Sequence, residues 1–241
     1  MGKKRNLYSE FARHYDYIFP ENQATTTFLK DVFTSGKILD LGCATGTYAL
    51  ALQGCKRELE GIDIDPEMIK EAIKKADKNP LKPLFRVGDI AKLDYSNKYQ
   101  GVYSIGNTIV HLPTIAAIAV LMTKIYQALV PGGETVIQII NYDRIIDRGL
   151  TELPDLEALG RRFQRRYEFS DDHLVFETAL TYDGTTALSQ TRLIPLRQSE
   201  LVEILGNAGF DSIICYGGYD KQPFRKDSSY HLIVRARKPA D

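Results

Sequence analysis

A loop of small residues between two regular segments constrains the fold of this 241-residue chain more than any other feature. Residues 37–41 are apolar and strand-like, Gly42, Ala44 and Gly46 follow, and residues 47–54 have a helical pattern. Small residues at such a turn let the backbone approach a ligand at the carboxyl end of a strand. The loop therefore predicts a β-α unit that binds a nucleotide-like molecule.

Alternating strand and helix patterns continue after this loop. Strand-like runs occupy residues 59–64, 84–90, 101–107 and 133–140, and helical patterns fill residues 66–76 and 114–129. Strands that alternate with helices at this spacing are typical of a parallel sheet covered on both faces. We therefore expect an α/β fold with a doubly wound, mostly parallel sheet.

An acidic residue follows the glycine loop at a distance that suits ribose binding. Asp63 lies 21 residues after Gly42, at the end of the next strand-like run. A carboxylate there can accept hydrogen bonds from two ribose hydroxyls. A nicotinamide dehydrogenase would share this acid, but its G-x-G-x-x-G loop would need glycine where this chain has Ala44 and Thr47. The loop therefore counts against a dehydrogenase.

Five short motifs follow one another in order along the chain. They are DLGCATG at residues 40–46, GIDIDPEM at 61–68, VGDI at 87–90, SIGNTIVHL at 104–112 and ALVPGG at 128–133. The set resembles the motifs of class I S-adenosylmethionine-dependent methyltransferases, with Ala44 in place of the middle glycine of their D-x-G-x-G-x-G loop. This resemblance implies a Rossmann-like seven-stranded sheet and S-adenosylmethionine as the cofactor.

The same resemblance implies a role for each matching residue at a methyl-donor site. The backbone of Gly42, Ala44 and Gly46 would cradle the methionine part of the donor, and Asp40 would hold the loop or the amino group. The other candidates are Asp63 for the ribose, Ile64 and Met68 for the adenine face, Asp89 and Ile90 for the adenine edge, Gly106 and Asn107 beside the methionine amino group, and Tyr15 as a cap. In a chain without a ligand, such acids and glycines would serve as helix caps and turn residues.

Two segments outside the alternating strand and helix region carry patterns that do not belong to a parallel sheet. Residues 7–19 predict an amphipathic helix with an aromatic face, and three strand-like runs within residues 161–197 predict a small antiparallel β insertion. We expect one methyltransferase domain over residues 1–241. Its parts are an N-terminal helical cap (1–35), a cofactor-binding half (36–141), the insertion as a lid (161–197), and a C-terminal helix with the final strands of the sheet (198–241).

Two segments suggest the methyl acceptor. YSEFARHYD at residues 8–16 and NYD at 141–143, together with the insertion, resemble small-molecule amine N-methyltransferases of the glycine or sarcosine type and of the aminosugar type. In the glycine-type enzymes this asparagine faces the substrate carboxylate, so the resemblance implies Asn141 as a substrate contact. Candidate cationic partners for the carboxylate are Arg144, Arg192 and Arg197. Glycine-type enzymes carry an arginine after the first helix, and its absence from residues 20–29 counts against glycine itself.

Methyl transfer from a sulfonium depends more on alignment than on a strong base. An amine must still be neutral when it reacts, so His111 and Tyr17 are candidate catalytic residues that accept its proton or hold it by hydrogen bonding. Each also has a structural interpretation, His111 as a histidine satisfied by backbone groups and Tyr17 as a packing residue.

Composition narrows the partners. Thirty-one Lys and Arg balance 31 Asp and Glu, so no net field concentrates a nucleic acid. The three cysteines form no C-x-x-C pair and the four histidines form no i, i+4 pair, so we predict no metal site. We expect a cytoplasmic enzyme with a small-molecule substrate and without a nucleic-acid or membrane partner, and the oligomeric state stays open.

Four arginines close together leave two interpretations open. Arg161, Arg162, Arg165 and Arg166 could bind a phosphate, or they could belong to a solvated charged face with the acids around them, which is the interpretation we favour. For the whole protein, the alternatives to amine methylation are an oxygen, RNA or protein acceptor and a non-catalytic nucleotide-binding protein.

Overall fold

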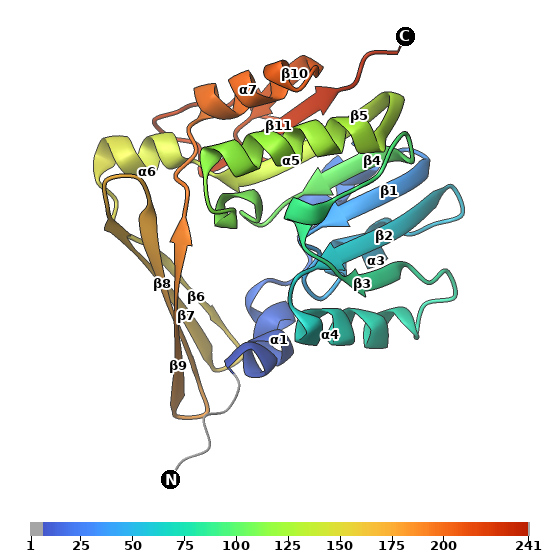
Figure 1. Cartoon of the computed structure of the whole chain (residues 1–241). Helices are drawn as coiled ribbons and strands as arrows, with labels where there is room; N and C mark the ends of the chain where they lie inside the picture. The colour runs from blue at the N-terminus through green and yellow to red at the C-terminus, as the bar shows by residue number, and fades with distance from the viewer. Residues whose placement is uncertain (1–6, 241) are drawn as a thin grey trace.

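The computed structural model describes residues 7–240, and the side chains of residues 11–240. They form a seven-stranded sheet with helices on both faces and a separate four-stranded sheet (Figure 1). The strands of the large sheet are β1 (Gly36–Leu41), β2 (Arg57–Asp63), β3 (Leu84–Val87), β4 (Tyr99–Ser104), β5 (Leu129–Ile140), β10 (Asp211–Tyr216) and β11 (His231–Arg237). The α-helices are α1 (Leu7–Ile18), α2 (Gln23–Val32), α3 (Thr47–Leu52), α4 (Pro66–Ala76), α5 (Ile115–Ala128), α6 (Tyr142–Arg148) and α7 (Gln198–Asn207). Residues 1–6 and 241 of the predicted domain lie outside the described residues.

The large sheet has the strand order β10-β11-β5-β4-β1-β2-β3. Strands β1 to β5 pair in parallel, and β11 runs antiparallel to both β5 and β10. The prediction of a doubly wound, mostly parallel seven-stranded sheet is therefore confirmed. Because Asp40 pairs with both Gly61 and Tyr103, the loops that follow β1, β2 and β4 meet at one edge of the sheet.

Alternating side chains of the strands build one core on each face of this sheet. Leu39 and Val102 pack on the side of α5 and α7, whereas Ile38 and Tyr103 pack on the side of α2, α3 and α4. This alternation holds the sheet between two helical layers and fixes where the carboxyl ends of the strands lie. No helix among the described residues has the length and the apolar composition that a membrane span requires.

The second sheet is an antiparallel meander at the carboxyl ends of the parallel strands (Figure 1). It contains β6 (Glu152–Ala158), β7 (Arg161–Phe169), β8 (Leu174–Tyr182) and β9 (Thr185–Leu193), in that order. The sequence predicted the insertion for residues 161–197, and this range omits β6. Two features concealed this strand: only Leu153 is buried among its residues, and Pro154 is tolerated because β6 is an edge strand.

Helix α6 was also missing from the prediction. It has only 7 residues, which is too short for a clear helical period. Its boundaries follow from its caps, because the side chain of Asn141 accepts a hydrogen bond from the Arg144 backbone N–H and Gly149 ends the helix with a φ of 59°.

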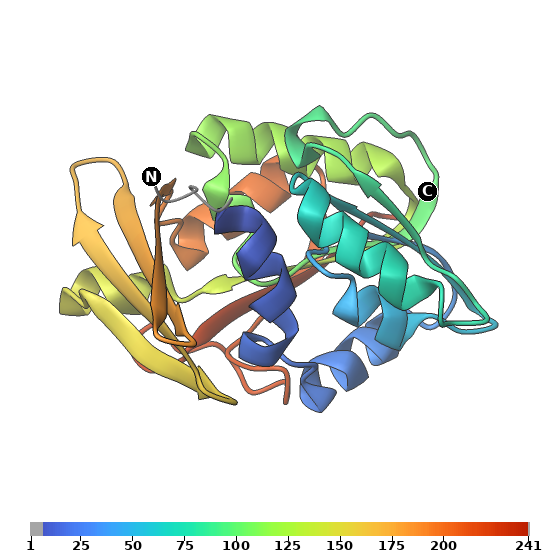
Figure 2. The ribbon, with the colours of Figure 1, turned by 90° about the horizontal axis from the view of Figure 1, so that it is seen from below.

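Helix α1 lies between the two sheets (Figures 1 and 2). Its residue Ile18 belongs to a small apolar cluster with Phe163, Leu180 and Tyr182 of the second sheet. The ring of His14 also lies 4.3 Å from that of Tyr182. Helix α1 and the second sheet thus contact each other beside the carboxyl edge of the parallel strands, which is where the predicted site lies.

Candidate functional site

The glycine loop links β1 to α3 with three residues in the left-handed region of φ. The φ angles are 76° at Gly42, 46° at Ala44 and 73° at Gly46. The Gly42 N–H donates to the carbonyl of Ile62 over 2.8 Å, which fixes the loop to the neighbouring strand. A Cβ atom on Gly46 would lie 2.4 Å from the ring of Phe85. Glycine is therefore required at this position by the fold itself, besides any role in ligand binding.

Asp63 lies at the end of β2 and faces this loop. Its Oδ2 accepts a hydrogen bond from the Ala44 N–H over 2.8 Å, and its Oδ1 accepts one from the Asp65 N–H over 2.9 Å. Burial raises the pKa of the Asp63 carboxyl, and these two backbone N–H groups oppose that rise. Because a carboxylate has about four acceptor sites, each oxygen of Asp63 can accept a further hydrogen bond from a ligand hydroxyl.

Asp40 is buried one strand away, near the end of β1. The hydroxyl of Tyr103 donates to its Oδ2 over 2.9 Å. Burial raises the pKa of Asp40 to about 8, an effect that the hydrogen bond from Tyr103 opposes and the negative charge of Asp63 reinforces. Asp40 therefore binds a proton in the folded protein at a pH where an exposed aspartate is ionised.

This raised pKa leads to a prediction for the variant Asp40→Asn. Between pH 4 and pH 8 the folded state retains a proton on Asp40 and the unfolded state does not, so the stabilisation that this proton provides is lost as the pH rises. An asparagine side chain does not titrate. The free energy of unfolding of the variant minus that of the wild type should therefore increase with pH across this range, by at most about 1.4 kcal/mol per pH unit. Denaturant titrations at several pH values measure the difference, and parallel curves would contradict the prediction.

The residues expected around the adenine are spread over two elements. Met68 is buried on α4, whereas the side chain of Ile64 is 71% exposed directly after Asp63. Asp89 caps a short 3-10 helix by accepting from the Ala91 N–H over 2.9 Å. A cavity of about 300 Å³ is bordered by Asp89 and by Ile62 and Gly88 at the ends of the strands. Ile90 is half-buried in the 3-10 helix that Asp89 caps.

The loop after β4 separates two predicted residues that are adjacent in the sequence. Gly106 is exposed with a φ of 76°, its N–H donates to Gln138 Oε1 over 2.7 Å, and a Cβ atom there would meet no atom within 4 Å. The amide of Asn107 is instead used inside the protein. Its Nδ2 donates to the Tyr142 hydroxyl over 2.9 Å and its Oδ1 accepts from the Ile140 N–H over 3.0 Å. Gly106 therefore offers open space to a ligand, whereas the side chain of Asn107 positions the loop.

A polar network attaches α1 to the glycine loop, and sequence reasoning missed it. Asp16 accepts hydrogen bonds from the Thr45 hydroxyl at 2.5 Å and the Thr47 hydroxyl at 2.9 Å, and an ion pair from Lys75 at 2.7 Å. Burial and the nearby charge of Asp63 raise the pKa of Tyr15, which is the preceding residue of the same helix. The predicted capping residue therefore lies close to the carboxylate expected to bind ribose.

The two catalytic candidates occupy different surroundings. The side chain of Tyr17 is 45% exposed, and the Arg161 guanidinium lies 4.1 Å from its ring centre. Since Tyr15 and Tyr17 are two residues apart on a helix, they point to opposite sides, so Tyr17 does not share the surroundings of Tyr15. His111 ends a short 3-10 helix after β4 and is exposed by surface area, although the protein atoms around its ring desolvate it and lower its pKa. His111 is therefore neutral at neutral pH and able to accept a proton.

Of the four predicted substrate contacts, Arg144 lies over the ring of Tyr230, and the other three are engaged in hydrogen bonds or ion pairs. Asn141 is fully buried, caps α6, and donates to the carbonyl groups of Lys226 and Ser229 over 3.0 and 2.9 Å. Arg197 forms ion pairs with two acids of α6, and Arg192 forms one with Asp172 on the surface. These interactions occupy the Nδ2 hydrogens of Asn141, and its role as a substrate contact stays a prediction. They also give both arginines structural partners.

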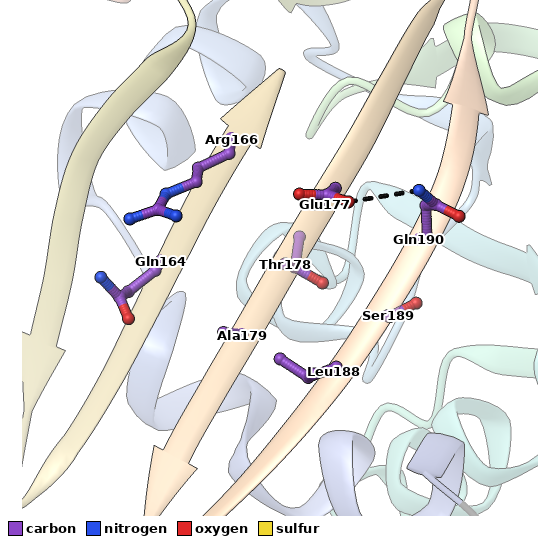
Figure 3. Close-up of a pocket in the computed structure, with 8 residues that line it drawn as sticks. All are labelled: Gln164, Arg166, Glu177, Thr178, Ala179, Leu188, Ser189 and Gln190. Atoms are coloured by element: carbon purple, nitrogen blue, oxygen red, sulfur yellow. Dashed lines mark hydrogen bonds between the residues drawn. The ribbon is translucent and has the colours of Figure 1, made fainter. Parts of the chain in front are cut away.

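A cavity of about 430 Å³ lies on the face of the second sheet that points away from α1 (Figure 3). Its lining residues come from β7, β8 and β9, and they are Gln164, Arg166, Glu177, Thr178, Ala179, Leu188, Ser189 and Gln190. None of the predicted site residues is among them. The candidate site therefore remains the edge of the large sheet, where the glycine loop, Asp63 and Gly106 meet.

Comparison with known proteins identifies the family of the chain. Residues 38–133 match the family described as Methyltransferase domain. A glycine/sarcosine N-methyltransferase from Aphanothece halophytica is 21% identical over 212 residues, which are 86% of this chain and 79% of that protein. The chain is a class I S-adenosylmethionine-dependent methyltransferase. Its methyl donor is S-adenosylmethionine, as predicted.

Solved structures have the same fold as this methyltransferase. An S-adenosylmethionine-dependent methyltransferase from Clostridium acetobutylicum has a TM-score of 0.79 at 17% identity, over 97% of this chain and 100% of that one. The amino pentose methyltransferase CalS10 from Micromonospora echinaspora, solved with S-adenosylmethionine bound, has a TM-score of 0.66 at 15% identity, over 99% of both chains. Both likenesses extend over the second sheet as well as the large one.

Proposed function

We propose that the methyltransferase transfers the methyl group to an amine nitrogen of a small molecule. One observation carries this proposal: the similarity to a glycine/sarcosine N-methyltransferase extends over 86% of the chain, well beyond the domain match at residues 38–133. A similarity of this length must include residues of α1 or of the second sheet, in addition to residues 38–133. Both elements lie beside the carboxyl edge of the parallel strands. These elements are suited to binding an acceptor, because ligands of open α/β sheets bind outside this edge.

The residues at this edge fit the methyl donor. Asp63 has acceptor sites left for the ribose hydroxyls, and Ile64 presents an exposed apolar side chain to one face of an adenine. Open space over Gly106 would admit the methionine part beside the glycine loop. Asp89 borders the cavity at the predicted adenine edge. These residues would hold the donor, while the donor itself supplies an electrophilic methyl group.

The contribution of the protein is mainly alignment and the control of protons. Holding the amine in line with the methyl group converts a bimolecular step into a unimolecular one, which lowers the barrier by several kcal/mol. The amine has to lose its proton before it attacks. His111 is our candidate acceptor for that proton, because its lowered pKa keeps the imidazole neutral, and Tyr17 remains the second candidate although Arg161 covers its ring.

The other acceptor classes have less support. The chain has no net charge, and α1 and the second sheet lie beside the edge that a long RNA or peptide would have to reach. An oxygen acceptor would use the same donor site, so only the reaction products separate it from an amine acceptor.

A product assay tests the proposal. Purified protein is incubated with S-adenosylmethionine and matched panels of small amines and of the alcohols with the same carbon skeletons, and methylated products are detected by mass spectrometry. We expect N-methylated products, with an equal amount of S-adenosylhomocysteine formed, and much less product from Asp63→Asn at a donor concentration well below the dissociation constant of that variant. Methylation of the alcohols alone, or no product from either panel by protein that binds the donor, would overturn the proposal.

A further inference from the structure

A closed polar network joins helix α1 to the glycine loop and to α4. Asp16 Oδ1 accepts from the hydroxyls of Thr45 and Thr47, and Asp16 Oδ2 accepts from Lys75 Nζ. Lys75 Nζ also donates to both hydroxyls over 3.0 Å, so each of its three N–H groups has a partner. We call Asp16, Thr45, Thr47 and Lys75 the latch. Each side chain of the latch uses its polar atoms on the other three, although the four residues come from distant parts of the chain.

The latch connects elements rather than capping one of them. Thr47 begins α3, but the N-cap of this helix is Gly46, and no side chain caps it. Lys75 lies in the last turn of α4, which ends with backbone hydrogen bonds from Asp77. The side chains of Asp16 and Lys75 are 41% and 31% exposed, so water can hydrate both charges when the network opens.

Helix α1 is attached to the two sheets by different kinds of contact. Ile18 belongs to the apolar cluster with Phe163 of the second sheet, and the rings of Phe11 and Phe19 each lie 5.6 Å from that of Phe163. None of residues 11–18 belongs to either core of the large sheet. Separating α1 from the second sheet would expose apolar surface, whereas opening the latch exposes polar groups that water can hydrate. We therefore expect α1 to move with the second sheet and to part from the large sheet at the latch.

The second sheet is joined to the core of the large sheet at one end of its strands. Leu174 of β8 and Leu193 of β9, which pair with each other, belong to the core that α5 and α7 cover. Leu180 belongs instead to the small cluster with Ile18, about 20 Å further along β8. Figure 1 shows these two ends of the sheet, one beside α6 and the other beside α1. The end that contacts α1 can therefore swing about the anchored end once the latch is open.

The closed latch places α1 beside the predicted donor site. Tyr15 precedes Asp16 in the helix, and burial and the nearby charge of Asp63 raise the pKa of Tyr15, so its ring lies close to the acid expected to bind ribose. Thr45 is 1% exposed and belongs to the glycine loop, which is expected to hold the methionine part. A donor that lies along Asp63 and this loop would therefore be covered by α1.

We propose that the latch controls exchange of the methyl donor, with Asp16 and Lys75 as positioning residues. While the latch is closed, α1 holds Tyr15 over the donor site. S-adenosylmethionine enters and S-adenosylhomocysteine leaves when Asp16 has parted from the glycine loop and from Lys75. The side chains of the latch are not among the groups expected to touch the donor, so the latch favours the closed state with and without a bound donor. The inference concerns the donor and is independent of the acceptor proposed above.

Binding rates test the latch. Association and dissociation of S-adenosylhomocysteine are measured by surface plasmon resonance on the full chain, for the wild type, Lys75→Met and the matched control Lys74→Met. Lys74 is the neighbouring residue and pairs with Glu71 of its own helix over 2.6 Å. We expect Lys75→Met to raise both rate constants about tenfold and to change Kd by less than about threefold, because a weaker latch increases the open fraction of the free and of the bound protein by the same factor. Lys74→Met should leave both rate constants unchanged.

Faster association is the result that a purely structural role would not produce. If Lys75→Met dissociates faster but associates no faster, the network only stabilises the bound state and the inference is overturned. Unchanged rate constants would overturn it as well. If Lys75→Met has a lowered melting temperature, Asp16→Asn repeats the test from α1, outside both cores of the large sheet. No acceptor is present in this measurement, so its failure leaves the proposed amine acceptor intact, and a failure to methylate amines leaves the latch intact.

Discussion

Replacing Asp63 with asparagine is expected to weaken binding of S-adenosylmethionine and S-adenosylhomocysteine by about 100-fold. The loss of two hydrogen bonds from ribose hydroxyls to a charged group, each worth about 1.5 kcal/mol, accounts for about two powers of ten. The side chain also accepts from the Ala44 and Asp65 N–H groups, and the NH2 group of an asparagine would oppose one of these donors. Both effects lower the affinity for the donor.

Asp65→Ala is the matched control for this variant. Asp65 lies two residues away in the same loop and caps α4 by accepting from the Glu67 N–H over 2.8 Å. Its loss should lower the free energy of unfolding by about 1 kcal/mol and leave the donor affinity almost unchanged. Calorimetric titration of both variants separates a ribose contact from general damage to the loop. Donor binding by Asp63→Asn within threefold of the wild type would remove Asp63 from the site.

The sequence was most informative where one residue has a conformational or spacing requirement. Gly42 and Gly46 follow a strand and precede a helix, and Asp63 follows at a fixed distance, so the loop and its acid could be located without a structure. The doubly wound, mostly parallel sheet followed from the alternation of strands and helices. These features depend on local sequence, and local sequence is what periodicity and spacing describe.

Contacts between distant residues could not be predicted in the same way. Asp16 lies on a helix with an aromatic face, and nothing near it in the sequence indicates that Thr45 and Lys75 are its partners. For Asn141 the sequence contains a signal that was overlooked. An asparagine followed eight residues later by Gly149 delimits a short helix, and this capping role uses the amide that the resemblance assigns to a substrate.

The arginine run shows why strand assignment matters. A solvated charged face is the natural interpretation when the four residues are taken together, and it describes Arg162 and Arg166. The alternation of β7 turns Arg165 toward the parallel sheet, where it is buried. A prediction that separated odd from even positions would have found this residue, because Phe163 and Tyr167 on the same face are aromatic and the even positions are polar.

Two glycine-to-alanine variants are expected to fail in different ways, although both glycines have a φ near 75°. In Gly46→Ala the added Cβ would lie 2.4 Å from Phe85 and 3.1 Å from Ala72. Left-handed strain costs about 1–2 kcal/mol and overpacking costs about 1–3 kcal/mol, so we expect the free energy of unfolding to fall by about 3 kcal/mol. In Gly106→Ala no atom lies within 4 Å of the added Cβ, so only the strain applies.

Gly106→Ala should be the more stable of the two variants, but its folded form should bind the donor more weakly than the folded form of Gly46→Ala. The methyl group that Gly106→Ala introduces would occupy the open space that we assign to the methionine part of the donor, so S-adenosylhomocysteine should bind this folded variant at least tenfold more weakly, a loss of about 1.4 kcal/mol. Denaturant titration measures the free energy of unfolding of each variant, and calorimetry measures its affinity for S-adenosylhomocysteine. If Gly106→Ala binds the donor as the wild type does, the open space beside β4 is not part of the donor site and the methionine part must lie elsewhere along the glycine loop.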